Sequence, residues 1–224
     1  MMTAYDLTET ALREVNQALH APGVSGEVVI TNPRGAHNVA VGIDAPIKVT
    51  IDGHCGYYAA GMNQQAEVTI NGNVGTGVAE NMMSGVVHVS GSASQSTGAT
   101  GRGGLLVIDG NAGARCGISM KGVDIVVGGD IGHMSAFMAQ AGRLVVRGDA
   151  GDALGDSIYE ARIYLRGSAK SLGADCTEKR MRSEHVEELA GLLKAAGYTD
   201  DDPASYKRYG SARTLYHFHV DNSY

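Results

Sequence analysis

The chain has 224 residues, a formal net charge of −6 and no basic tract, which argues against a nucleic-acid-binding role. It contains no run of eighteen apolar residues, so we expect no membrane span, and its first residues lack the basic and apolar regions of a secretory signal. Three cysteines without a CxxC pair make a poor disulfide set and indicate reduced, buried thiols in a cytoplasmic protein.

Residues 1–25 are predicted to form a capping helix. Asp6 and Glu9 resemble a helix capping pair, and an apolar stripe comes after them, made of Leu12, Val15 and Leu19. We expect this helix to cover the first coil of a solenoid formed by the following residues, because an open solenoid end exposes strand edges and core. The stripe could instead bind a partner subunit.

Residues 26–46 resemble an atypical first coil. Residues 28–30 and 39–41 are strand-like and flank a turn sequence, Asn-Pro-Arg-Gly, at 32–35. The segment is out of phase with the later copies of the repeat, as terminal repeats often are.

Residues 47–173 repeat with a period of nineteen, marked by a glycine in each of seven copies. Aliphatic residues stand four and two positions before every one of these glycines, as Val49 and Ile51 do in the first copy. The marker glycines are Gly53, Gly72, Gly91, Gly110, Gly129, Gly148 and Gly167.

The period predicts an all-β fold in which each copy is one coil of a solenoid. Aliphatic residues two apart project to one side of a short strand, here the interior. Because parallel crossovers are overwhelmingly right-handed, we expect a right-handed parallel β-helix over residues 26–176, about seven coils and roughly 30 Å long. Coils of nineteen residues argue against the left-handed hexapeptide helix, which needs eighteen.

Two columns of small residues are predicted to form corners. We expect the marker glycines to end each strand where φ can be positive and backbone approaches backbone. A second column, seven residues after each marker, indicates a tight interior turn; it holds Ala60, Ala79, Gly98, Gly117, Ala136, Gly155 and Ala174.

The sequence offers no pattern that assigns a catalytic, cofactor-binding or metal-ligating residue. The Ser- and Gly-rich run at 90–104 could bind a phosphate with its backbone amides. It lacks a P-loop pattern, and its simpler interpretation is as a structural part of the repeat. His217 and His219 could share one strand face without a third ligand. The methionines late in several coils, such as Met62 and Met82, could fill the core or form a contact surface.

Residues 177–224 form the third predicted region, a helix followed by an aromatic tail. Ser183 can cap a helix whose stripe is Val186, Leu189, Ala190 and Leu193, with Gly197 at its end. Aromatic and arginine side chains are enriched in interface cores, so the tail is predicted either to contact a partner or to dock on the solenoid. The candidate interface residues are Tyr206, Arg208, Tyr209, Arg213, Tyr216 and Phe218.

Glycine-punctuated coils such as residues 110–117 and 129–134 resemble the GXGXG domain. That domain is the C-terminal β-helix of the glutamate synthase large subunit, and it also occurs in a β-helical subunit of formylmethanofuran dehydrogenase. The tail, at residues 209–213 and 218–222, is similar to a narrower group of stand-alone domain-3-like proteins, which includes the β-helical subunit of N-methylglutamate synthase.

The resemblance implies a non-catalytic structural subunit of a hetero-oligomeric complex. One partner would be a class II glutamine amidotransferase-like subunit, and the other a glutamate-synthase-like subunit holding FMN and an iron–sulfur cluster. The complex would join methylamine to glutamate, giving N-methylglutamate and ammonia. No cofactor is expected in this chain. The alternatives are a scaffold like the β-helical subunit of formylmethanofuran dehydrogenase and, less simply, a free-standing β-helical enzyme acting on polysaccharide.

Overall fold

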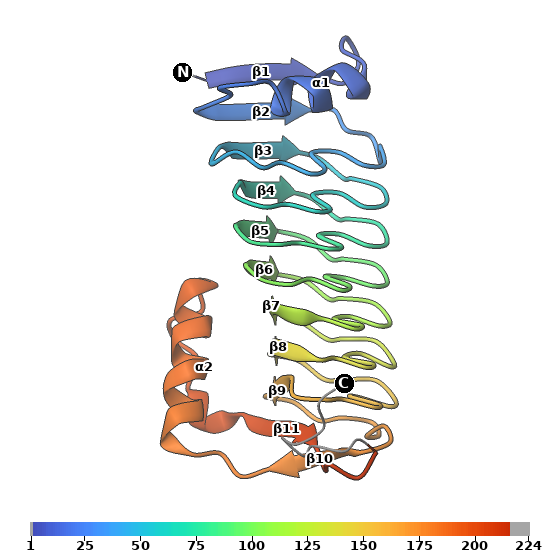
Figure 1. The fold of residues 1–224 in the computed structure, drawn as a ribbon, viewed down its shortest axis with the longest axis vertical. Helices are drawn as coiled ribbons and strands as arrows, with labels where there is room; N and C mark the ends of the chain where they lie inside the picture. Colours follow the sequence, from blue (N-terminus) through green and yellow to red (C-terminus); the bar gives the residue numbers. More distant parts are fainter. Residues whose placement is uncertain (1, 216–224) are drawn as a thin grey trace, which may run out of the picture.

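The computed structural model describes residues 2–215 and shows a β-solenoid with short strands stacked along one long axis (Figure 1). Nine strands follow each other in sequence order and pair in parallel. They are β1 (Met2–Asp6), β2 (Glu27–Thr31), β3 (Lys48–Asp52), β4 (Glu67–Asn71), β5 (Val86–Val89), β6 (Leu105–Ile108), β7 (Lys121–Val127), β8 (Ala141–Val146) and β9 (Arg162–Leu165).

The strand register follows the nineteen-residue period, which confirms the predicted fold. Val49 pairs with Val68, Val68 with Val87, and the same step continues to Ile163. All fourteen aliphatic residues of the two marked columns point into the core and are at most 1% exposed. Burying each of them is worth about 1.5–3 kcal/mol, so these columns contribute strongly to the rod's stability.

The coil from β2 to β3 is two residues longer than the nineteen-residue copies that follow it. Val28 of β2 pairs with Val49 of β3, whereas Val49 pairs with Val68 of β4. Residues 28–30 lie in a strand as predicted. The prediction of a second strand at 39–41 is wrong: these residues form a turn in which Ala40 has a φ of +57°.

The N-terminal region is part strand and part helix, which corrects the expectation of a helix from the first residues. β1 extends the parallel sheet by one strand, and α1 runs only from Leu12 to Leu19. Asp6 does not cap this helix; its carboxylate accepts hydrogen bonds from Thr8 in the turn after β1 and from Asn32. Val15 and Leu19 of α1 are buried in the core at the open end of the first coil.

The C-terminal region closes the other end of the sheet. After β9 the chain forms β10 (Cys176–Lys179), helix α2 (Ser183–Ala195), a 3-10 turn (Pro203–Ser205) and β11 (Lys207–Ser211). β11 pairs antiparallel with both β9 and β10, so the parallel ladder stops at β9. α2 lies alongside the outer face of the last coils (Figure 1).

Helix α2 packs on an outward column of the solenoid. The residue between the two buried aliphatic positions is Thr50, Thr69 or His88 in early coils, where it is half-buried. In late coils it is Val126, Val145 or Tyr164, which are fully buried against Leu189, Leu192 and Leu193 of the helix. The expected stripe is therefore partly wrong, because Leu192 replaces Val186 and Ala190, and Arg182 rather than Ser183 is the N-cap.

Within residues 2–215, neither of the two α-helices is long and apolar enough to cross a membrane.

Candidate functional site

A ladder of polar side chains runs along one edge of the solenoid, immediately after the marker glycines. From His54 to Asp149, each side chain accepts a hydrogen bond from the backbone N–H of the equivalent residue one coil later, at 2.7–3.1 Å. The ladder consists of His54, Asn73, Ser92, Asn111, Asp130, Asp149 and Ser168. Its side chains satisfy backbone donors that no strand partner accepts, so this row of polar residues stabilises the stack.

The marker glycines leave room for this ladder. A Cβ built on Gly129 would lie 2.0 Å from Oδ1 of Asn111, and one on Gly148 would lie 2.2 Å from Oδ1 of Asp130. The expectation of positive φ at these corners is wrong, since among the seven only Gly53 has it, at +134°. Close approach of the preceding coil is what requires glycine at the other six.

Positive φ belongs instead to the second column of small residues. Ala60, Ala79 and Ala136 have φ between +52° and +57° and are fully buried. Gly98, Gly117 and Gly155 share this conformation at the equivalent position, with φ of +65° to +69°. These six residues form the tight interior turn predicted, in the left-handed conformation that disfavours larger side chains. The prediction is wrong for the seventh, Ala174, which is exposed and does not have positive φ.

The Ser- and Gly-rich run of the third repeat copy is hydrogen-bonded within the stack. The N–H groups of Ser94, Ser96 and Gly98 donate to carbonyl oxygens of the neighbouring coils. Those of Thr100 and Arg102 do the same. Because these amides are already paired, the alternative of a phosphate-cradling loop is wrong.

The candidate interface residues of the tail divide into two groups. Tyr206 is 4% exposed and Tyr209 is 6% exposed, both packed against the solenoid or α2. The guanidinium of Arg208 is half-buried and donates two hydrogen bonds to the carbonyl oxygen of Arg180. This part of the tail thus docks on its own chain. Arg213 is exposed; Tyr216, Phe218, His217 and His219 lie outside the described residues.

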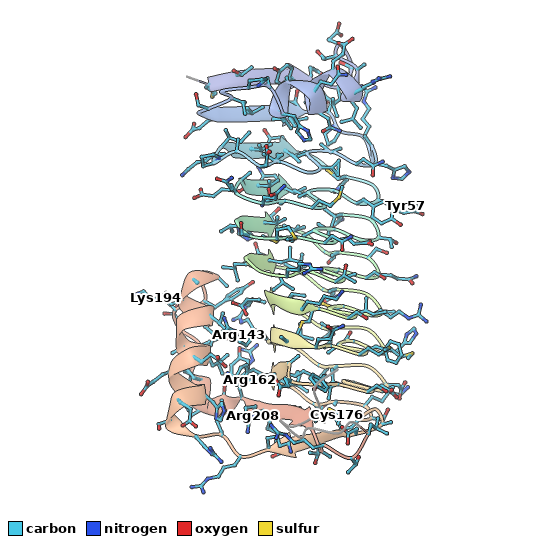
Figure 2. The ribbon with its side chains drawn as sticks, in the orientation of Figure 1. Tyr57, Arg143, Arg162, Cys176, Lys194 and Arg208 are labelled. Atoms are coloured by element: carbon cyan, nitrogen blue, oxygen red, sulfur yellow. The ribbon has the colours of Figure 1, made fainter. Side chains whose placement is uncertain are left out.

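Two carboxylates fasten helix α2 and the segment after it to the strands. Glu188 accepts hydrogen bonds from Arg143 and Arg162, at 3.2 and 2.7 Å, and from the Tyr164 hydroxyl. Figure 2 shows Arg143 and Arg162 on the side of the late coils that α2 covers. Asp201 accepts two from Arg147, at 2.7 and 2.9 Å, and others from Arg166 and Tyr206. The hydrogen bonds from Arg147 and then Tyr206 lower the pKa of Asp201 to about 2.

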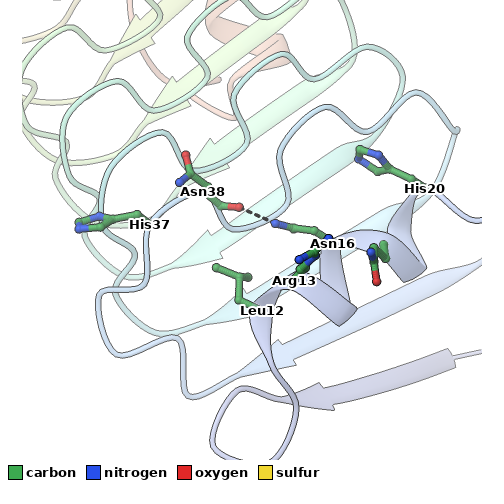
Figure 3. Close-up of a pocket in the computed structure, with 7 residues that line it drawn as sticks. Leu12, Arg13, Asn16, His20, His37 and Asn38 are labelled. Atoms are coloured by element: carbon green, nitrogen blue, oxygen red, sulfur yellow. Dashed lines mark hydrogen bonds between the residues drawn. The ribbon is translucent and has the colours of Figure 1, made fainter.

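An open depression of about 490 Å³ lies where α1 meets the first coil (Figure 3). Its polar groups hold the two elements together: the Asn16 amide donates to the carbonyl of Asn38 and accepts from the N–H of Ala40. His20 bonds the carbonyl oxygen of Val41, and His37 accepts the N–H of Tyr57. The side chains around this depression therefore close the end of the solenoid.

Several large apolar side chains remain exposed on the turns of the coils. Tyr57, Tyr58 and Met62 in the first repeat copy are 51%, 43% and 51% exposed. Both alternatives for the methionines occur: Met82 and Met120 are fully buried, whereas Met62, Met83 and Met138 are exposed. The first-copy cluster, Tyr57, Tyr58 and Met62, is an apolar surface suited to contact with another protein.

The thiols of all three cysteines are free, and burial suppresses their ionisation. Cys55 and Cys116 are buried, and desolvation raises the pKa of each to about 12. Cys176 is half-buried, and burial followed by the nearby carboxylates of Asp175 and Asp156 raises its pKa to about 12 as well. No cysteine has the lowered pKa of a reactive thiol.

We expect these thiols to be inert in the folded protein. At pH 8 a disulfide reagent that reports released thiolate should modify Cys55 and Cys116 at least about a thousandfold more slowly than free cysteine, because only the thiolate reacts. In concentrated urea all three should react at the free rate. Rapid modification of Cys116 without denaturant would show that its coil opens or that its burial is misassigned.

Among residues 2–215, no group of three or more His, Cys, Asp or Glu side chains is placed to hold a metal ion.

Comparison with known proteins shows a relative that matches nearly the whole chain. No family model matches the chain. The chain is 61% identical over 227 residues to Protein GlxC of Rhizobium meliloti (strain 1021), and the alignment covers 99% of each protein. At this identity and coverage the two chains share their fold from end to end.

Proposed function

Because this chain belongs to the family of Protein GlxC, we propose that it serves as the β-helical scaffold subunit of a glutamate-synthase-related complex. The coil geometry supports the proposal together with the resemblance to the GXGXG domain. In such a complex the rod holds two catalytic subunits at a fixed separation.

One observation carries the proposal: a column of polar side chains in the repeat, and the carboxylates that pair with its arginines, hold the stack together. The ladder from His54 to Ser168 bonds backbone amides of successive coils. Asp124, Glu188 and Asp201 pair with arginines of the strands. Such groups supply rigidity, which is what a spacer between two active sites requires.

The finer proposal concerns the reaction and the partners. We propose that the complex is an N-methylglutamate synthase, joining methylamine to glutamate in the cytoplasm. A class II glutamine amidotransferase-like subunit would contact one part of the rod, and a subunit holding FMN and an iron–sulfur cluster another. The exposed cluster Tyr57, Tyr58 and Met62 is the contact surface we assign to a partner.

Co-purification tests this proposal. The chain, tagged at its N-terminus in its native host, should retain both partner subunits, and the eluate should show flavin absorbance that the isolated chain lacks. Mass spectrometry identifies the retained proteins. A partner with a molybdenum or tungsten pterin would instead favour the formylmethanofuran dehydrogenase-like scaffold. A chain that elutes alone would contradict the scaffold function.

A surface variant tests whether the first-copy cluster contacts a partner. Tyr58→Ser combined with Met62→Ser should reduce retention of one partner while leaving the melting temperature unchanged, since both side chains are exposed. Met138→Ser, at an exposed position several coils away along the rod, is the matched change. Equal retention by all three proteins would show that the first-copy cluster is not the contact surface.

A further inference from the structure

A polar cavity of about 450 Å³ lies at the C-terminal end of the rod. Segments far apart in the sequence converge on it: the turn before β9, the end of β10, the first turn of α2, and β11 with the residues after it. Its lining residues include Glu160, Arg162, Lys179, Arg182, His185, Arg208 and Arg213. Four separate parts of the chain thus form one concave surface.

The charge of this cavity is opposite to that of the whole protein. Among the described residues that line it there are five cationic side chains and a single carboxylate, that of Glu160. The full chain carries a net charge of −6. A concave cluster of one sign focuses the electrostatic potential, so the cavity attracts anions although the protein as a whole repels them.

Two carboxylates beside this cavity pair with cations that line it. Glu188 accepts hydrogen bonds from Arg162, as well as from Arg143 and Tyr164, and Glu184 lies 3.6 Å from Arg182. Asp175 accepts hydrogen bonds from Ser211 and Thr214. Arg208 instead donates to a neutral carbonyl oxygen, so these hydrogen bonds leave the charge of its guanidinium uncompensated.

The guanidinium of Arg208 is held in place by the backbone. Its Nε and Nη2 donate to the carbonyl oxygen of Arg180, at 3.2 and 3.0 Å, which fixes the plane of the group. Burial lowers the pKa of Arg208, and the positive charges of Arg162 and Arg182 lower it further. An anion in the cavity would relieve this repulsion between like charges.

The first turn of α2 adds to the same field. The helix has thirteen residues and begins at the cavity, with Arg182 as its N-cap and His185 in its first turn. The positive end of its dipole therefore faces the same space as the arginines.

We propose that this cavity is a binding site for a small polyanion, one that carries two or more carboxylate or phosphate groups. Planar guanidinium groups match both kinds of group with paired hydrogen bonds. The cations surround a compact hollow instead of lining an extended stripe, which suits a metabolite better than an acidic segment of a protein. The inference is independent of the proposed scaffold function.

Titration calorimetry on the purified full-length chain tests the site, with pyrophosphate as the phosphate probe and citrate as the carboxylate probe. We expect saturable one-to-one binding of at least one probe, weakening as potassium chloride is raised from 50 to 300 mM because salt screens charge (about 14 to 6 Å of screening length). The stronger probe identifies which anionic group the site prefers. Each probe is compared with potassium chloride at matched ionic strength.

Variants locate the binding. Arg208→Gln should weaken the affinity about tenfold, as expected for loss of a charge-assisted paired contact. The double variant Lys179→Gln/Arg182→Gln, at a half-buried and an exposed position, should also weaken binding. It tests the site independently if Arg208→Gln fails to fold. Arg102→Gln, an exposed arginine in a distant coil, is the matched control and should bind like the parent chain.

Two results would overturn the proposal. One is the absence of saturable binding of both probes at millimolar concentration by the folded parent chain. The other is binding that Arg208→Gln and the Lys179/Arg182 double variant leave unchanged. If an acidic peptide such as hexaglutamate saturates the site while neither small probe does, the cavity serves a protein partner and the small-polyanion assignment is wrong.

Discussion

Gly129→Ala is expected to destabilise the protein by about 3 kcal/mol, the largest effect predicted for a single added methyl group. The new Cβ would lie 2.0 Å from Oδ1 of Asn111 and 3.0 Å from the carbonyl oxygen of Gly110. Asn111 would have to move, and the N–H of Asp130 would lose the acceptor that now lies at 2.8 Å. The change thus combines overpacking between coils with an unpaired backbone donor.

Urea unfolding followed by circular dichroism measures this effect, and Gly191→Ala is its matched control. Gly191 lies in α2, and a Cβ added there would meet nothing within 4 Å, so the same change should stabilise the helix by about 1 kcal/mol. Gly129 does not have positive φ, so alanine is tolerated by its backbone, and only the close approach of the preceding coil opposes the methyl group. A free energy of unfolding for Gly129→Ala within about 0.5 kcal/mol of the parent chain would refute the ladder.

Asp201→Ala should cost about 3 kcal/mol and loosen the segment after α2 from the strands. The Asp201 side chain is 7% exposed and accepts hydrogen bonds from Arg147, Arg166 and Tyr206. Its removal leaves Arg147 without its paired acceptor and frees the hydroxyl of Tyr206, which is 4% exposed. Asp200→Ala changes the adjacent, exposed carboxylate and should leave the free energy of unfolding nearly unchanged.

The Asp201 carboxylate should also make the free energy of unfolding depend on pH, with lower stability in acid. The pKa of Asp201 is lowered from 3.8 to about 2 in the folded chain, chiefly by the hydrogen bonds from Arg147. Its contribution of about 2 kcal/mol is therefore fully present above pH 3.8 and is lost as the pH falls towards 2. In acid titration the free energy of unfolding of the parent chain should fall more steeply from pH 3.8 towards pH 2 than that of Asp201→Ala. Identical acid profiles for the two proteins would contradict the assigned pairing.

The period of the glycines was sufficient to predict the coil, the strand register and the inward aliphatic columns. Val49 and Ile51 recur as aliphatic residues in all seven copies because every coil buries the same two positions. The tight interior turn was also predictable, since Ala60 and its equivalents are never larger than alanine. Regular spacing is a property of the chain itself, which is why these features needed no structure.

The reason for the marker glycines could not be read from their own column. It lies in the next column, where His54, Asn73 and Ser92 share only a side-chain acceptor and not a residue type. The ladder would have been found by asking which positions of the repeat always carry a side-chain hydrogen-bond acceptor, instead of which always carry the same residue type. The change of the outward column from Thr50 and Thr69 to Val126 and Val145 likewise signalled that a helix covers the late coils.

The strand β1 and the tail depend on contacts between distant segments, so local sequence predicted them poorly. Residues 2–6 have no strong strand pattern, and they become a strand because β2 offers an open edge. Tyr206 and Tyr209 have the composition of an interface, yet the surface they fill is the solenoid of their own chain. A sequence shows which residues seek burial, but it does not show which surface buries them.

Reconstitution tests the central claim, that this chain is a rigid scaffold, most directly. The two partner subunits proposed above, amidotransferase-like and flavin-binding, would be mixed with and without this chain, and the proposed reaction, methylamine-dependent formation of N-methylglutamate from glutamate, would be measured. The scaffold account predicts no turnover and no bound flavin for this chain alone, and coupled turnover only when all three are present. Full coupled turnover by the two partners without this chain, or turnover by this chain alone, would contradict it.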